Sequence, residues 1–95
     1  MLARGVVTEM VADAEVETAA RDLAVRLANG PTRAHAAHKT LLRLWAQGGV
    51  QAADEAIMEI SVPLYETQDV RNGLASAIDA LKRGEKRPTL IFEGR

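Results

Sequence analysis

A chain of 95 residues has room for one domain, and its 12 basic and 13 acidic residues give a net charge of −1. This balance argues against general nucleic-acid binding, which needs a clustered basic surface. The lack of cysteine in the sequence excludes disulfides and thiolate metal sites. No apolar run approaches the ~20 residues of a membrane helix, and the N-terminus has no signal-peptide pattern. We therefore expect a soluble, cytoplasmic protein.

Alanine dominates the apolar residues, and the only aromatic residues are Trp45, Tyr65 and Phe92. Alanine favours helix but adds little buried area, and apolar burial stabilises by about 25 cal/mol per Å². A chain of this length buries only about 60 to 65% of the surface that its unfolded form exposes. We expect close-packed helices around a thin core, with a shape that fits against another surface.

The first twelve residues predict an incomplete structural unit. Residues 2–5 are typical of the last turn of a helix, with Gly5 in the left-handed position after its end. The valine-rich residues 6–11 predict a short strand, and no other segment predicts a strand that could pair with it. Because the chain starts at Met1, in the middle of this unit, we expect a second chain or a second copy to supply the pairing.

About four amphipathic helices are predicted after this segment. Asp13 is a good N-cap for the first helix, over residues 14–28, and glycine and proline at 30 and 31 end it. The second helix opens at Thr32 and stops at Gly48-Gly49. The third helix begins near residue 50.

Proline shapes the end of the third helix. Pro63 should kink or end it a turn early, because proline removes a backbone hydrogen bond. Residues 67–69 restart the chain as a fourth helix with Asp69 as its N-cap, and Gly84 ends that helix. An apolar tail follows over residues 87–92. The fold class expected from these signals is mainly α, with a short N-terminal strand.

Few side chains are placed for chemistry. His35 and His38 share a face of the second helix, but zinc needs at least one further ligand, so we read both as surface histidines. Glu55 and Glu59 are one turn apart, and we expect both to face solvent, because paired carboxylates act as acid and base only in a cleft that shifts a pKa. Trp45 is expected in the core or an interface. We predict no catalytic residue, no metal and no cofactor.

Five segments occur in a familiar order along essentially the whole chain: Ala3-Arg4-Gly5-Val6-Val7, Leu27-Ala28-Asn29-Gly30-Pro31-Thr32, Lys39-Thr40-Leu41-Leu42, Thr67-Gln68-Asp69 with Gly73, and Phe92-Glu93-Gly94-Arg95. In this order they resemble the C-terminal part of the enoyl-CoA hydratase/isomerase (crotonase) family. The first segment resembles the stretch that leaves the enzyme core. By this resemblance, residues 1–95 form a single truncated domain, in which residues 1–12 are a remnant of the core junction and residues 13–95 are the helical region.

The resemblance mainly implies what the chain lacks. In that family the catalytic carboxylates, and the backbone N–H groups that hold the thioester oxygen, lie in the β/α core that precedes these helices. Oxyanion donors are usually the largest contributor to such catalysis, so we expect no activity from the chain alone. The family's C-terminal helices cover the acyl-CoA site and build trimer contacts.

One basic cluster is present, and its residues are Lys82, Arg83, Lys86 and Arg87. The resemblance implies that these cations could contact the phosphates of CoA, for which lysine and arginine are suitable donors. The alternative is a solvated helix end, because cations are also favoured near the helix C-terminus.

The sequence departs from the family pattern at three places. Asn72 stands where the family commonly has an acid before Gly73. Ala77 and Ile78 stand where an aromatic residue often contacts the ligand, and Pro63 is unusual within the third helix. These departures put the wall of the acyl site in doubt more than the fold.

Two classes of function are expected. The first is a segment that completes a split acyl-CoA enzyme, a lyase or isomerase of fatty acid metabolism, by docking on a separately encoded crotonase-like core. The second is a non-enzymatic helical module that self-associates through the same apolar faces; a relic with no activity is a further alternative. The expected partners are a homo-oligomer or the core, with acyl-CoA contact only in a complex and with no nucleic acid and no membrane.

Overall fold

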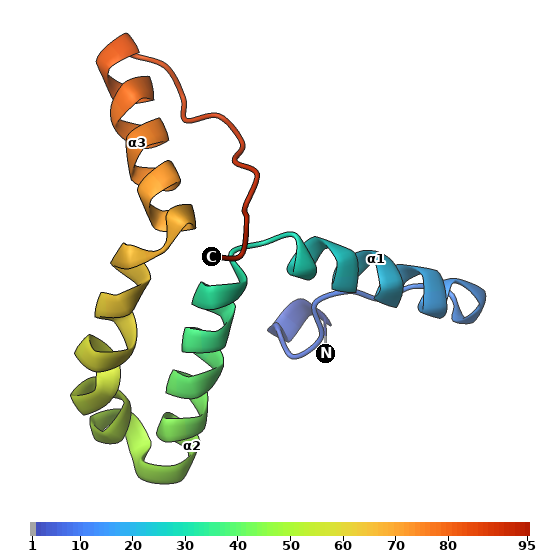
Figure 1. Cartoon of the computed structure of the whole chain (residues 1–95). Helices are drawn as coiled ribbons and strands as arrows, with labels where there is room; N and C mark the ends of the chain where they lie inside the picture. Colours follow the sequence, from blue (N-terminus) through green and yellow to red (C-terminus); the bar gives the residue numbers. More distant parts are fainter. Residues whose placement is uncertain (1) are drawn as a thin grey trace.

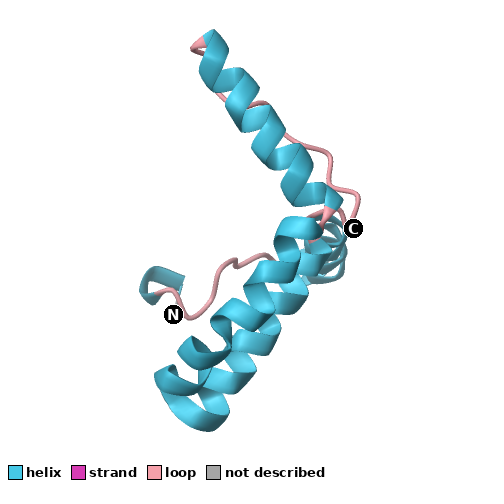
Figure 2. Cartoon of the chain, turned by 60° about the vertical axis from the view of Figure 1, so that its left-hand side comes forward, coloured by secondary structure: helices cyan, strands magenta, loops and turns pink. Residues whose placement is uncertain are grey.

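The computed structural model describes residues 2–95, and Met1, the predicted start of the N-terminal unit, lies outside the described residues. The chain is mainly α, as predicted (Figures 1 and 2). Three α-helices and three short 3-10 helices follow one another in the order η1 (Leu2–Arg4), η2 (Asp13–Glu15), α1 (Val16–Ala28), α2 (Thr32–Ser61), η3 (Val62–Glu66) and α3 (Gln68–Arg83).

The predicted N-terminal strand is not present in the structure. Residues 6–12 form neither helix nor strand, and no strand occurs anywhere in residues 2–95. A strand needs an extended neighbour to accept its backbone hydrogen bonds, and this part of the chain lies beside α1 instead. The preceding turn is as predicted: Gly5 has a φ of 73° and donates its N–H to the carbonyl oxygen of Leu2 at 3.0 Å.

The first helix ends where the sequence predicted but begins differently. Asp13 is not its N-cap, because Asp13 starts the 3-10 turn η2 and α1 begins only at Val16. The helix ends at Ala28, as predicted. Gly30 has no positive φ, and a Cβ at this position would lie 2.8 Å from Cε1 of His35, so the imidazole ring would have to shift to make room for it.

Helix α2 is a hairpin of two arms, residues 32–48 and 50–61, which lie side by side in Figure 1. The turn between them is Gly49, whose φ of 76° and ψ of −173° are not helical. The second and third predicted helices are therefore these two arms. A cavity of about 140 Å³ between the arms and η3 is lined by Ala34, Ala37, His38, Leu41, Ser61 and Leu64.

Pro63 ends α2 a turn early, as predicted, and the chain continues as η3. The N-cap of α3 is Thr67 and not Asp69, which corrects the prediction. The Thr67 hydroxyl accepts a hydrogen bond from the N–H of Val70 at 3.3 Å and donates one to the carbonyl oxygen of Leu64 at 2.6 Å. One side chain thus links η3 to the start of α3.

Replacing Thr67 by alanine should lower the free energy of unfolding by about 1 kcal/mol, because the first turn of α3 loses its cap. Urea denaturation followed by circular dichroism would measure the change. Thr67→Ser keeps the hydroxyl and should stay close to the wild type. Equal stability of Thr67→Ala and the wild type would contradict the capping role.

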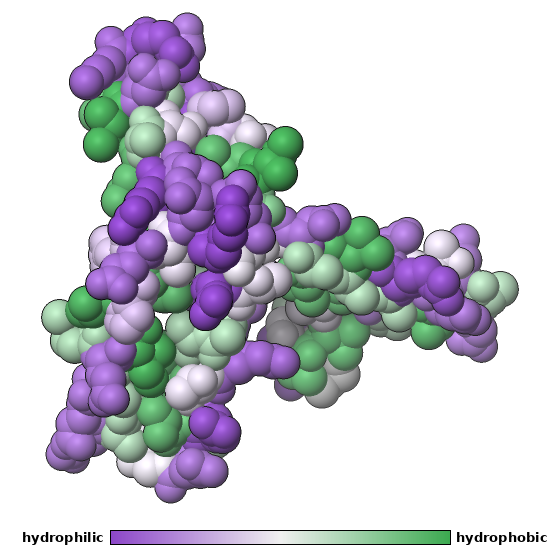
Figure 3. Space-filling model, viewed as in Figure 1, coloured by the Kyte–Doolittle hydropathy of each residue, from purple (hydrophilic) through white to green (hydrophobic). Residues whose placement is uncertain are grey.

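The chain is extended and has almost no core of its own. Its radius of gyration is 17.1 Å, whereas a compact domain of this length has about 12.4 Å. Within residues 2–95, Ala80 is the only buried apolar residue and Asp69 the only buried polar one. The thin core expected from the composition is therefore observed, and apolar side chains reach the surface in several places (Figure 3).

Candidate functional site

Helix α3 presents two different apolar faces. The first carries small residues and is covered by the C-terminal tail, residues 85–95, which runs back from Gly84 toward the start of the helix (Figure 1). Ala80 on this face is 1% exposed, and a Cβ at Gly73 would lie 3.6 Å from Cδ1 of Leu90 in the tail. Small side chains therefore let the tail approach the helix closely.

The second face of α3 is exposed. Leu74, Ile78 and Leu81 follow a spacing of four and three residues, so they lie on one side of the helix. Each is at least half exposed, and Leu81 reaches 80%. We call these three residues the α3 apolar face. A side of a helix this apolar ordinarily packs against another element.

A second apolar row crosses from α2 into η3. Met58, Val62 and Tyr65 have the same helical spacing, and all three are exposed. Trp45, on the other arm of α2, is 55% exposed, close to the exposed Leu42. Trp45 is therefore not in the core of the isolated chain, which leaves an interface as its predicted role.

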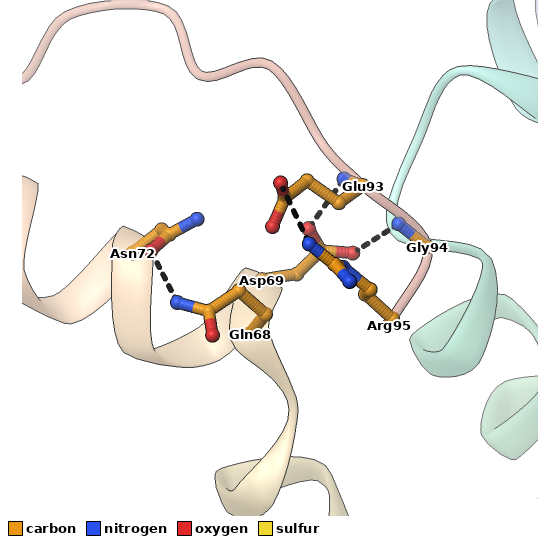
Figure 4. Close-up of polar contacts among 6 residues, drawn as sticks. All are labelled: Gln68, Asp69, Asn72, Glu93, Gly94 and Arg95. Atoms are coloured by element: carbon orange, nitrogen blue, oxygen red, sulfur yellow. Dashed lines mark hydrogen bonds and ion pairs between the residues drawn. The ribbon is translucent and has the colours of Figure 1, made fainter.

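The most enclosed polar group is the carboxylate of Asp69, which fixes the end of the tail (Figure 4). Its Oδ1 accepts a hydrogen bond from the N–H of Glu93 at 2.6 Å, and its Oδ2 accepts one from the N–H of Gly94 at 2.9 Å. The N–H of Asp69 donates to the carbonyl oxygen of Arg95 at 3.0 Å. We call these three hydrogen bonds the Asp69 clamp.

The clamp also brings the tail to the start of α2. Gly94 has a φ of 74°, and a Cβ there would lie 2.8 Å from Oγ1 of Thr32. An acidic side chain in the first turn of a helix is favoured by the helix dipole, which adds to the two hydrogen bonds of Asp69. Sequence reasoning placed Asp69 at the right helix end but missed its partners, since they lie 24 and 25 residues further along the chain.

A cavity of about 210 Å³ lies beside the clamp. Its lining residues come from the start of α2, from η3, from the start of α3 and from the tail: Pro31, Arg33, Ala34, Leu64, Thr67, Asp69, Val70 and Phe92. The cavity wall is mainly apolar. The Asp69 oxygens at this wall already accept hydrogen bonds from the tail. The cavity can hold an apolar group, but its wall offers no nucleophile with a base.

The predicted basic cluster lies at the end of α3 and in the first residues of the tail, and all four of its members are exposed: Lys82, Arg83, Lys86 and Arg87. Arg83 forms ion pairs with Asp79 at 2.8 Å and with Glu85 at 3.1 Å. These two carboxylates reduce the positive charge of the cluster, which favours the solvated helix end over a phosphate site in the isolated chain.

The remaining polar candidates are separate from one another. His35 is half-buried beside Gly30, whereas His38 is exposed. In the described part of the chain, residues 2–95, no three histidine or acidic side chains come together where they could hold a metal ion. Glu55 and Glu59 are exposed, as predicted, and Glu55 accepts a hydrogen bond from Nε2 of Gln51 at 2.8 Å.

Comparison of the chain with protein-family models, with curated proteins and with solved structures finds no match. The resemblance to the crotonase family therefore rests on the sequence segments alone. Among residues 2–95, no helix has the length and apolar character needed to cross a bilayer.

Proposed function

We propose that this chain is a helical segment that docks on a crotonase-like α/β core and completes an acyl-CoA enzyme of the hydratase or isomerase type. Two observations support this proposal, one from the sequence and one from the structure. The order of the sequence segments suggests the identity of the partner, and the large exposed surface of the chain suggests that a partner exists.

The exposed surface carries the proposal. The chain exposes 7988 Å², whereas a compact monomer of 10.3 kDa would expose about 5,400 Å². The excess of about 2,600 Å² is on the scale of the area that an obligate complex buries. The exposed residues include the α3 apolar face and the row at Met58, Val62 and Tyr65, and apolar and aromatic side chains of this kind are enriched in interfaces.

The residues of this chain indicate which parts of the acyl-CoA site each molecule would contribute. The core would supply the carboxylates and the oxyanion donors, since the described residues contain no cleft that pairs such groups. The chain would supply the cover of the acyl site. Among the basic residues, Lys82, Lys86 and Arg87 would be available for CoA phosphates, because Arg83 is already paired with two carboxylates.

A reconstitution experiment tests the proposal. The chain is mixed with a crotonase core produced without its own C-terminal helices, and complex formation is measured by sedimentation. Hydration of crotonyl-CoA is then followed for the core alone, the chain alone and the mixture. We expect a complex and activity only in the mixture. A core that neither binds the chain nor gains activity would overturn the proposal.

The α3 apolar face should be part of the contact. Leu81→Asp should weaken binding to the core at least tenfold, which is about 1.4 kcal/mol, because it puts an unpaired charge into an apolar interface. The free energy of unfolding of the isolated chain should change by less than about 0.5 kcal/mol, since Leu81 is on the surface. Titration calorimetry would measure the affinity.

Ala75→Asp is the matched control. Ala75 is exposed and lies one turn before Asp79, so the substitution adds the same charge to the polar side of the same helix. We expect this variant to bind the core like the wild type. Equal binding by Leu81→Asp and Ala75→Asp would show that the α3 apolar face is not in the contact.

A further inference from the structure

The C-terminal tail is an extended segment whose backbone is unpaired. It returns along α3 from Gly84 to Asp69 in nine residues, over a helix length of about 22 Å. This demands about 2.5 Å per residue, which extended backbone provides and a helix does not. Within residues 2–95, residues 86–92 form no backbone hydrogen bond with the rest of the chain, and the Asp69 clamp begins only at Glu93.

The side chains of the tail alternate as they do in a strand. The alternation covers residues 89–93: residues 90 and 92 are half-buried against the helices, whereas residues 89, 91 and 93 are exposed. Residues 85–88 are all exposed, and Gly94 has a φ of 74°, which is not extended. Ile91 is 91% exposed, more than any other large apolar side chain of the described residues. The tail therefore resembles the edge strand of a sheet, with one face on α3 and the other in solvent, and such an edge can accept another strand.

One pair of opposite charges in the tail is symmetric about Leu90. Arg87 and Glu93 lie three residues before and three residues after Leu90 and have opposite charges, whereas Lys86 has Gly94 at the matching position. Arg87 and Glu93 are odd-numbered, like Ile91, and all three residues are exposed. Two tails that run antiparallel with their Leu90 residues opposite each other would bring Arg87 of each copy against Glu93 of the other.

We infer that the tail pairs as a β-strand with the tail of a second copy of this chain, and that the two tails run antiparallel. A parallel, in-register pair would place every charge against the same charge, so the charge pattern selects the antiparallel direction. Within residues 2–95, the ion pair of Glu93 is with the exposed Arg95, two residues away, and Arg87 forms none. Such local pairs are weak and can be exchanged.

Proline fixes which backbone groups would pair. In an antiparallel ladder, only alternate residues donate and accept across the strands. Pro88 has no N–H, so it must lie in a non-hydrogen-bonded pair, which leaves Thr89 of each copy hydrogen-bonded to Ile91 of the other. The ladder stops at Glu93, whose N–H is held by Asp69. A two-stranded ribbon alone is marginal, but here each strand already rests on its own α3.

This dimer goes beyond the proposed docking on a core, because it uses the free backbone edge of the tail and leaves the α3 apolar face free. The two proposals can therefore fail independently. A chain that dimerises through its tail and ignores the core would refute only the proposed function.

Charge reversal and rescue test the pairing in the full chain. We expect the wild type to show a monomer–dimer equilibrium in sedimentation experiments. Arg87→Glu and Glu93→Arg should each raise the dissociation constant by about tenfold or more, because each change turns two attractive pairs of the symmetric dimer into repulsive ones. The double variant with both changes should dimerise like the wild type, because its pairs are only inverted.

Mixing the two single variants gives a stricter test. Arg87→Glu carries two acids at the paired positions and Glu93→Arg carries two bases, so the two variants should prefer each other to themselves. Damage to the fold could not produce this result. In the wild-type dimer the amides of Thr89 and Ile91 should be slowed in hydrogen exchange relative to those of Leu90 and Phe92. A monomeric wild type, single variants that dimerise normally, or a mixture that fails to pair would overturn the inference.

Discussion

Replacing Asp69 by alanine should release the C-terminal tail and lower the free energy of unfolding by about 3 kcal/mol. The variant loses two hydrogen bonds to a charged acceptor, each of which typically contributes about 1.5 to 3 kcal/mol. The total stability of a domain is only about 5 to 15 kcal/mol, so this is a large fraction of it. Urea denaturation would give the change in stability.

Amide exchange locates the effect. In Asp69→Ala the amides of Glu93 and Gly94 should exchange rapidly, because their acceptor is gone. Asp79→Ala is the matched control: it removes an acid from the same helix, but one that is exposed and forms an ion pair with Arg83. Its stability should change by less than about 0.5 kcal/mol. Continued protection of Glu93 and Gly94 in Asp69→Ala would contradict the clamp.

Replacing Gly49 by alanine should destabilise the α2 hairpin by about 2 kcal/mol. The φ of 76° and ψ of −173° at this position belong to a region that is almost restricted to glycine. A Cβ here would meet nothing within 4 Å, so the expected cost is one of backbone conformation and not of packing. The strain is relieved if the two arms of α2 join in one straight helix.

Two measurements follow for Gly49→Ala. Denaturation should show the loss of stability, and small-angle scattering should show a radius of gyration above 17.1 Å, because a straight helix of 30 residues is about 45 Å long. A semisynthetic chain with D-alanine at position 49 is the control. D-Alanine favours positive φ and should match or exceed the wild type in stability. Equal effects of the two alanine enantiomers would exclude backbone strain as the cause.

The resemblance to crotonases stays a prediction, and the docking that it implies would involve the exposed apolar faces. The structure establishes a mainly helical chain with exposed apolar faces. What covers those faces is a proposal, because a contact with another molecule is not part of the fold of one chain. The reconstitution experiment and the charge-reversal experiment therefore address different surfaces of the same molecule.

The ends of the helices could be predicted from local sequence signals. The stops at Ala28, Gly49 and Gly84 and the early end before Pro63 were all predicted, because glycine and proline act on the backbone within one turn of their own position. The thin core was predicted for a similar reason: the high alanine content limits how much area any arrangement of these helices can bury.

Longer-range features depend on the folded path of the chain and could not be predicted in this way. Asp13 and Asp69 are equally plausible N-caps in the sequence, yet Asp13 begins a 3-10 turn and Asp69 holds the tail. The valine-rich residues 6–11 have strand propensity, but a strand forms only where a neighbour accepts its hydrogen bonds. The clamp joins residues more than twenty positions apart, and local patterns carry no information about such a pairing, because the tertiary structure as a whole brings the two groups together.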